Sequence, residues 1–142
     1  MNIFVYGTLM DPEIMQAVSG AYYAGRSATL HGYVRKRIAG EVYPAIIPDH
    51  GASVRGVLYC GVTAESLLRL DRFEGSQYDR HEVAVELENE GPMRAQTYVL
   101  AVACRGQLSN DDWVYQEFMQ TGKAQLLKEC HRAENSRKRL EP

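Results

Sequence analysis

The segment 78–88 alternates apolar and polar residues, which is the pattern of a β-strand with one buried face. One face carries His81, Val83, Val85 and Leu87. A turn sequence rich in Asn, Gly and Pro follows at 89–92, and a second run of β-forming residues covers 94–103. The chain is therefore predicted to contain a β-hairpin, and such a hairpin must find further strands to cover its apolar face.

Further segments of the chain predict more strands than helices. A chain of 142 residues, 45% of them hydrophobic, is long enough for one domain with a real core and too short for two ordinary ones. We expect an α+β fold, in which helices flank a small, mainly antiparallel β-barrel, with one domain over residues 1–131 and a polar, disordered tail over 132–142.

Pro44 and Pro48 are expected to exclude a regular central strand at their own positions. Strands are predicted at 2–6, 28–38, 42–47 and 53–62, and helices at 11–18, 64–73 and 110–130, the last weakened at Gly122.

Charge and cysteine content exclude several classes of function. The net charge of −2 gives no broad positive field, so nucleic acid is not an expected partner. Three cysteines, an odd number without a C-x-x-C pair, favour reduced thiols and a cytoplasmic location. The four histidines lack the spacing of a zinc site, so no metal ligands are predicted. Neither a signal peptide nor a membrane span is recognisable, and the sequence leaves the oligomeric state open.

The loop after the first predicted strand is a candidate anion-binding site. Gly7 ends the strand, and Asp11 followed by Pro12 marks the start of a helix. A tight loop between a strand and a helix can present several backbone N–H groups together, which suits a carboxylate. The alternative is that Gly7 merely permits the turn.

Glu74 is the strongest candidate for a reactive side chain. Thr63 is a suitable N-cap and Gly75 a suitable end for the helix between them. On this helix Ala64, Leu67, Leu68 and Leu70 define one face, and Glu74 falls inside it. Loss of hydration there raises a carboxyl pKa toward neutrality. Asp71 projects onto the same side. The alternative is that Glu74, at the end of a short helix, simply contacts water.

Five short motifs occur in an order that resembles the γ-glutamyl cyclotransferase-like superfamily, and they resemble most closely its branch of γ-glutamylamine cyclotransferase and avirulence-induced-gene-like proteins. The similarity covers about residues 1–105. It implies a small β-barrel with one pocket between the first loop and the glutamate-bearing segment. The motifs are Tyr6-Gly7-Thr8-Leu9, Tyr43-Pro44-Ala45, Val54-Arg55-Gly56-Val57-Leu58-Tyr59, Leu70-Asp71-Arg72-Phe73-Glu74-Gly75 and Tyr78-Asp79-Arg80.

This resemblance implies an activity and a role for each site residue. Glu74 would be the general acid and base that converts a γ-glutamyl compound into 5-oxoproline and a free amine or amino acid, without a cofactor. Asp71 and Arg80 would support the site, with Arg80 keeping Asp71 ionised. Two alternatives stay open: a non-catalytic module that binds a small carboxylate, and a thiol-dependent acyl hydrolase that uses Cys60 or Cys104. The substrate would contact Tyr6, Gly7, Thr8, Leu9 and Tyr78.

Overall fold

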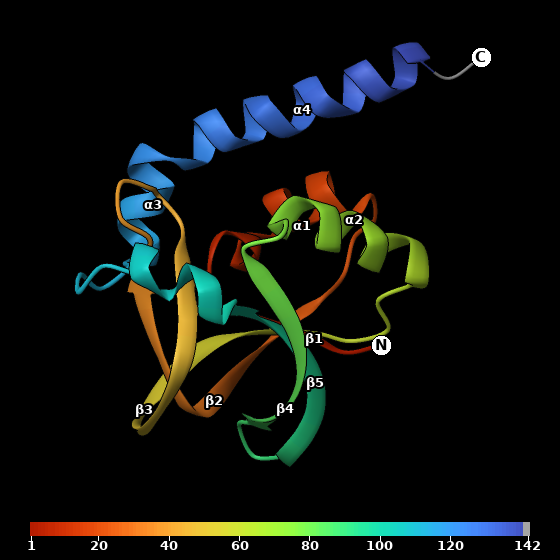
Figure 1. Cartoon of the computed structure of the whole chain (residues 1–142). Coiled ribbons are helices and arrows are strands. Elements are labelled where there is room, and N and C mark those ends of the chain that lie inside the picture. Colours follow the sequence, from red (N-terminus) through yellow and green to blue (C-terminus); the bar gives the residue numbers. More distant parts are fainter. Residues whose placement is uncertain (141–142) are drawn as a thin grey trace.

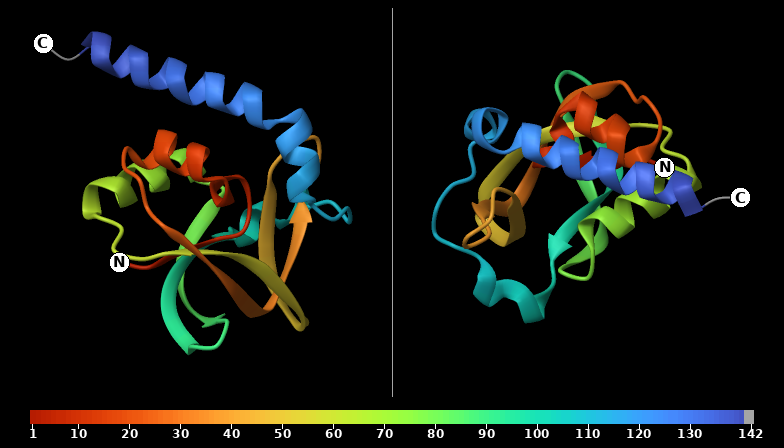
Figure 2. Two further views of the ribbon diagram at one scale, coloured as in Figure 1. Left: turned by 180° about the vertical axis from the view of Figure 1, so that it is seen from behind. Right: turned by 90° about the horizontal axis from the view of Figure 1, so that it is seen from above.

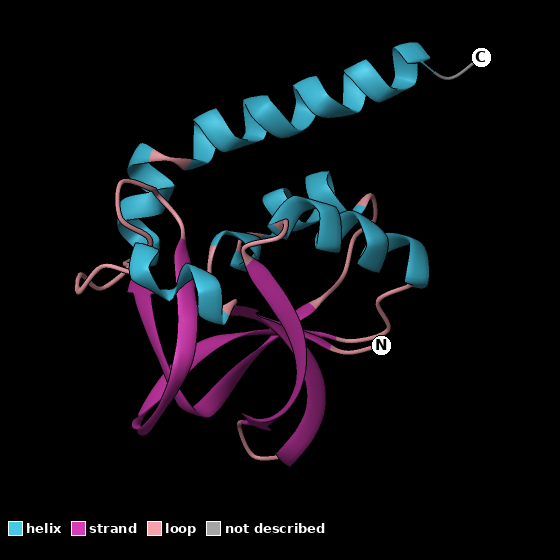
Figure 3. Cartoon of the chain, viewed as in Figure 1, coloured by secondary structure: helices cyan, strands magenta, loops and turns pink. Residues whose placement is uncertain are grey.

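A computed structural model describes the backbone of residues 1–140 and the side chains of residues 1–133. Strands form a barrel in the lower half of Figure 1, and helices lie above it. Figure 3 shows the same division by secondary structure. In chain order the elements are β1 (Ile3–Val5), η1 (Thr8–Met10), α1 (Pro12–Ser19), β2 (Gly25–Arg37), β3 (Pro44–Tyr59), α2 (Ala64–Glu74), β4 (Tyr78–Leu87), β5 (Gly91–Leu100), η2 (Val102–Gln107), α3 (Tyr115–Thr121) and α4 (Lys123–Leu140).

The five strands close into a barrel in the order β1-β3-β2-β4-β5. All neighbouring pairs are antiparallel except β1 and β5, which are parallel. The predicted hairpin is β4 and β5, paired from Tyr78 opposite Leu100 to Leu87 opposite Gly91. Asn89 in its turn adopts the left-handed conformation, with φ of 67°. The α+β fold with a mainly antiparallel barrel is therefore confirmed.

The helices cover one side of the barrel in two layers. Helices α1 and α2 contact each other and lie over the strands, and α4 crosses above α1 (Figure 2). Both predicted N-caps are confirmed, because Asp11 accepts a hydrogen bond from the backbone N–H of Ile14 and Thr63 accepts one from that of Ser66. No helix in the described part of the chain has the length and apolar character needed to cross a bilayer.

The core has two parts, one on each side of the strands that separate the barrel interior from the helices. Inside the barrel the side chains of β-strands pack together, with Phe4, Leu30, Ile46, Leu58 and Val85 among the buried members. Under the helices, residues of α1 and α2 pack on the strands, among them Ile14, Met15, Leu67, Leu70 and Tyr59. The apolar face predicted for α2 is buried only in part, because Leu67 and Leu70 are buried whereas Ala64 and Leu68 are exposed. Ser66 is buried in their place, and its hydroxyl donates to the backbone carbonyl of Ser19 on α1.

Strand β3 is longer than predicted. It is continuous from Pro44 to Tyr59, whereas the sequence pattern predicted two pieces, at 42–47 and 53–62. Pro48 lies opposite Tyr33, next to the register shift that follows His31, and in the described pairings the first half of β3 has only β2 as neighbour. The missing N–H of Pro48 therefore interrupts no second ladder, as is usual at sheet edges and bulges.

The single helix predicted over 110–130 is wrong. The hydroxyl of Ser109 accepts a hydrogen bond from the N–H of Asp111 at 3.2 Å and donates one to the backbone carbonyl of Arg37 at 2.7 Å, and no helix follows directly. The N–H of Arg37 in turn donates to the carbonyl of Asp111 at 2.9 Å, so this segment is held against β2. Helical structure begins at Tyr115, outside this contact.

The C-terminal helices meet at Gly122, the position where the sequence predicted weakness. The backbone of 132–140 belongs to α4, although these residues were expected to form a disordered tail. They contain neither Gly nor Pro, so a helix that is already nucleated can continue through them. The side chains from residue 134 on, and residues 141–142 altogether, lie outside the described part, and the domain boundary at residue 131 stays a prediction.

Candidate functional site

The candidate site is a pocket of about 440 Å³ between the loop after β1 and the end of α2. Gly7, Thr8 and Leu9 line it from the loop, and Glu74 lines it from α2. Tyr6 and Tyr78 line it as well. The structure therefore brings the proposed reactive carboxylate and all the predicted substrate-contacting residues to one cavity. The size of this cavity suits a small molecule.

The loop after β1 is shaped by its contact with the start of β3. A Cβ atom at Gly7 would lie 2.8 Å from Cγ of Pro44, so only glycine fits without displacing the proline ring. Thr8 and Leu9 begin the short helix η1, and their N–H groups therefore have no acceptor within it. The hydroxyl of Tyr59 donates to the carbonyl of Leu9 at 2.9 Å and holds the loop in place.

Arg35 supports the same loop from behind. Its Nη1 donates to the carbonyl oxygens of Tyr6, at 2.8 Å, and of Arg55, at 3.2 Å. The guanidinium carbon lies 5.4 Å from the centre of the Trp113 ring, within the range of a cation–π contact. These contacts fix the carbonyl that precedes Gly7, and with it the direction of the following N–H groups.

Glu74 is half-buried and, among the described residues, has no hydrogen-bond or ion-pair partner. Burial raises the pKa of its carboxyl from 4.5 to about 8, and the negative charge of Asp71 adds to this effect. A carboxyl group with such a pKa can accept and release a proton near neutral pH. The predicted shielding of Glu74 is therefore present in the structure.

Tyrosine rings surround Glu74, and their hydroxyls are bonded to other groups. Tyr6 donates to the carbonyl of Tyr98 at 2.6 Å, and Tyr78 donates to that of Pro44 at 2.8 Å. Burial, together with the charge of Glu74, raises the pKa of the Tyr6 and Tyr78 phenols well above the ordinary value. The rings thus shield part of the carboxylate from water and remain neutral themselves.

The carboxylate of Asp71, unlike that of Glu74, has two side-chain partners among the described residues. The hydroxyl of Tyr98 donates to its Oδ1 at 2.7 Å, and Nε of Arg80 lies 3.2 Å from the same oxygen. Arg80 is the partner that the sequence analysis expected for Asp71. Asp71 thus has the contacts of a structural carboxylate, and its charge acts on Glu74 from one helical turn away.

Some lining residues were not predicted as site residues. Tyr98 of β5 is one of them. The end of α3 and the beginning of α4 carry no recognisable motif, and their polar residues resemble those of any solvated helix face. Those that line the pocket are Thr121, Gly122, Gln125, Leu126 and Glu129.

Neither candidate thiol is part of the pocket. Cys60 is exposed and Cys104 is half-buried, and neither is among the lining residues. In the described part of the chain, no three His, Cys, Asp or Glu side chains are grouped to hold a metal ion.

The family model and the related sequences point to the same protein family. The family model described as "Gamma-glutamyl cyclotransferase, AIG2-like" matches residues 3–116. AIG2-like protein A of Arabidopsis thaliana is 37% identical over 99 residues, which are 69% of this chain, and the chain spans 60% of that relative's length.

Solved structures share the fold. A solution structure of another Arabidopsis thaliana protein superposes with a TM-score of 0.68 and 28% identity, covering 99% of this chain and 93% of that one. A structure named gamma-glutamyl cyclotransferase has a TM-score of 0.57 at 16% identity, over 71% of this chain and 66% of that one, and shares the fold alone. The family match includes the loop at Gly7, the segment ending at Glu74 and the strand of Tyr78, which are three of the elements that build the pocket. The chain thus belongs to the AIG2-like γ-glutamyl cyclotransferase family.

Proposed function

We propose that this protein is a γ-glutamyl cyclotransferase that releases 5-oxoproline and an amine or amino acid from a γ-glutamyl compound, with Glu74 as general acid and base. The observation that carries the proposal is a half-buried carboxylate with a raised pKa and no partner among the described residues, in the same pocket as the N–H groups of the Gly7 loop. A carboxyl group in this state is suited to proton transfer.

Binding orients the substrate at its α-carbon. The α-carboxylate is placed at the backbone N–H groups of Gly7, Thr8 and Leu9, as an anion at free backbone donors. Its α-ammonium group then lies toward Glu74. An adjacent positive charge favours the ionised carboxylate, so binding itself lowers the pKa of Glu74 and prepares the base. Tyr6 and Tyr78 close the sides of the site.

The reaction is an intramolecular acyl transfer. Glu74 takes a proton from the α-ammonium group, and the nitrogen lone pair attacks the γ-carbonyl carbon to close a five-membered ring. The bond between this carbon and the leaving nitrogen breaks, and Glu74 returns its proton to that nitrogen. The ring nitrogen gives up its second proton to the released amine, which departs as an ammonium ion. The nucleophile and electrophile belong to one molecule, so positioning supplies much of the rate.

The proposal is tested by incubating the protein with γ-glutamyl amines and γ-glutamyl dipeptides and measuring 5-oxoproline by mass spectrometry. We expect Glu74→Gln to lower kcat by about 10²–10⁴-fold, the usual contribution of a general acid or base. Glu65→Gln is the matched control, because Glu65 is exposed on the same helix and is not among the lining residues. Full activity of Glu74→Gln contradicts the assigned role.

The same experiment separates the two alternatives. A γ-glutamyl compound that raises the Tm but is recovered unchanged identifies a binding module instead of an enzyme. Release of free glutamate instead of 5-oxoproline, abolished by alkylation of the thiols and retained in Glu74→Gln, identifies the thiol-dependent hydrolase. We also infer a cytoplasmic location from the reduced cysteines, to be checked by fractionation.

A further inference from the structure

The pocket has a wall that the family model does not include. The match to the family ends at residue 116, and five pocket-lining residues come after it. Gln125 and Glu129 are four residues apart on α4, so successive turns of this helix present them on one side, and Thr121 ends α3. We call the five residues Thr121, Gly122, Gln125, Leu126 and Glu129 the C-terminal wall.

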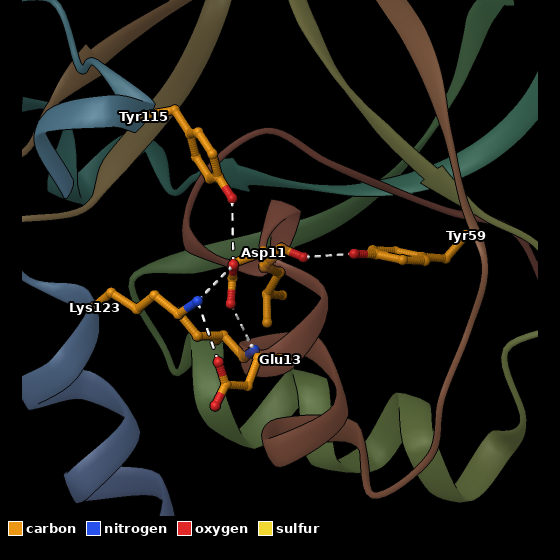
Figure 4. Close-up of polar contacts among 7 residues, drawn as sticks. Asp11, Glu13, Tyr59, Tyr115 and Lys123 are labelled. Atoms are coloured by element: carbon orange, nitrogen blue, oxygen red, sulfur yellow. Dashed lines mark hydrogen bonds and ion pairs between the residues drawn. The ribbon is translucent and has the colours of Figure 1, made fainter. Parts of the chain in front are cut away.

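Lys123 fastens this wall to α1 (Figure 4). Its Nζ lies 3.0 Å from Oδ1 of Asp11 and 3.2 Å from Oε1 of Glu13. The Asp11 side chain is only 5% exposed, and that of Lys123 is 20% exposed. Tyr115 donates to the same Oδ1 at 3.4 Å. An ion pair shielded to this extent fixes the wall more firmly than a surface pair would.

The same carboxylate also fixes the loop on the other side of the pocket. Asp11 directly follows η1, and its N–H donates to the carbonyl of Thr8 at 3.3 Å. Its second oxygen, Oδ2, caps the N–H of Ile14 at 3.1 Å. Asp11 therefore sets the position of the C-terminal wall relative to the loop that faces Glu74.

The charges around the pocket distinguish its regions. Among the described lining residues the acidic members are Glu41, Glu74 and Glu129, and none is Lys or Arg. The proposed function assigns Glu74 to the glutamyl end of the substrate, where the reaction takes place. The leaving group, which lies beyond the γ-carbonyl, therefore contacts the other residues that line the pocket. This lining has two exposed acidic side chains, Glu41 from the segment between β2 and β3 and Glu129 from the C-terminal wall. The amide of Gln125 donates to Glu129 Oε1 at 3.4 Å.

We propose that Glu129, supported by Gln125, is the specificity-determining residue for the group attached to the γ-carboxyl of the substrate. This inference rests on the proposed function, because it assigns the glutamyl end of the ligand to the Gly7 loop and Glu74. A carboxylate in the wall attracts a leaving group with a positive end and repels one with a negative end. The C-terminal segment, outside the matched part of the family, thus selects the leaving group.

The experiment compares three substrates that differ only in the charge at the far end of the leaving group. They are the γ-glutamyl derivatives of butylamine, of 1,4-diaminobutane and of 4-aminobutyrate. For each, kcat/KM is measured with the wild-type chain, with Glu129→Lys and with Glu117→Lys. Glu117 is exposed on α3 and is not among the lining residues, so the control makes the same change of charge outside the pocket.

We expect Glu129→Lys to lower the ratio of kcat/KM for the diaminobutane derivative to that for the aminobutyrate derivative by about tenfold, as for reversal of a partly screened charge. The butylamine derivative should change by less than about twofold, because it carries no charge at that end. If the ratio of kcat/KM values is the same in Glu129→Lys as in Glu117→Lys, the inference is overturned. The proposed cyclotransferase activity is unaffected by that result, because 5-oxoproline is still formed.

Failure of the proposed function gives a different result. The wild-type chain then forms 5-oxoproline from none of the three compounds, and their Kd values are measured by calorimetry instead. A tenfold change in the ratio of Kd values that is specific to Glu129→Lys still supports the wall as a selector of charge. An unchanged ratio, or no binding of any of the three, overturns it.

Discussion

Replacing Glu74 with Gln should make the protein more stable at alkaline pH, because the buried carboxylate opposes folding once it is ionised. Its pKa is about 8 in the folded protein and 4.5 as the ordinary value. Between these pH values the folded state holds a proton that the unfolded chain has released, so the free energy of unfolding falls as pH rises through this window. The change in pKa corresponds to at most about 5 kcal/mol, and we expect about 2–3 kcal/mol because the pocket admits some water.

Urea denaturation at about pH 4.5 and about pH 8.5 measures this effect. We subtract the free energy of unfolding of the wild-type chain from that of Glu74→Gln at each pH. This difference should be about 2–3 kcal/mol larger at the higher pH. Glu65→Gln, on the exposed first turn of the same helix, should show a change of less than about 0.5 kcal/mol. The same difference at both pH values would show that the Glu74 carboxylate is solvated and would refute the reasoning.

Three further substitutions test the contacts that shape the pocket. Gly7→Ala should destabilise the fold by about 1–3 kcal/mol and weaken substrate binding, because its Cβ would lie 2.8 Å from the Pro44 ring. Thermal denaturation and KM measure these two effects, and an unchanged KM would contradict the prediction. Tyr78→Phe removes the 2.8 Å hydrogen bond to the Pro44 carbonyl and should cost about 1 kcal/mol in urea denaturation, while equal stability would show that water replaces the hydroxyl. Lys123→Met leaves the carboxylate of Asp11 without its ion pair and should cost about 1–3 kcal/mol by the same method, whereas a loss below about 0.5 kcal/mol would show that the pair is only a surface contact.

Much of the secondary structure followed from local sequence patterns. The alternation over 78–88 predicted the β4–β5 hairpin, because a strand with one buried face requires a period of two. Thr63 and Gly75 marked both ends of α2, since capping depends only on neighbouring residues. The same local reasoning failed for residues 109–114, where hydrogen bonds to Arg37, distant in sequence, replaced the expected helix.

The candidate site was predicted only in part, for a related reason. Glu74 and the loop at Gly7 stood out because a carboxylate on an apolar face and a glycine after a strand are local signals. Nothing local indicated that Gln125 and Glu129 line the same cavity, since the spacing of polar residues on a helix does not say what the helix faces.

The sequence by itself determined the β-rich α+β class, the caps of α1 and α2, and the presence of an acidic residue on the apolar side of α2. Only the tertiary structure decided that the Glu74 carboxylate and the Gly7 loop line one pocket, that Asp11 is paired with Lys123, and that the C-terminal helices complete the pocket. The physical reason is that hydrogen bonding, turns and hydrophobic periodicity act over a few residues. Burial, raised pKa values and ion pairs arise between segments that come together only when the barrel closes.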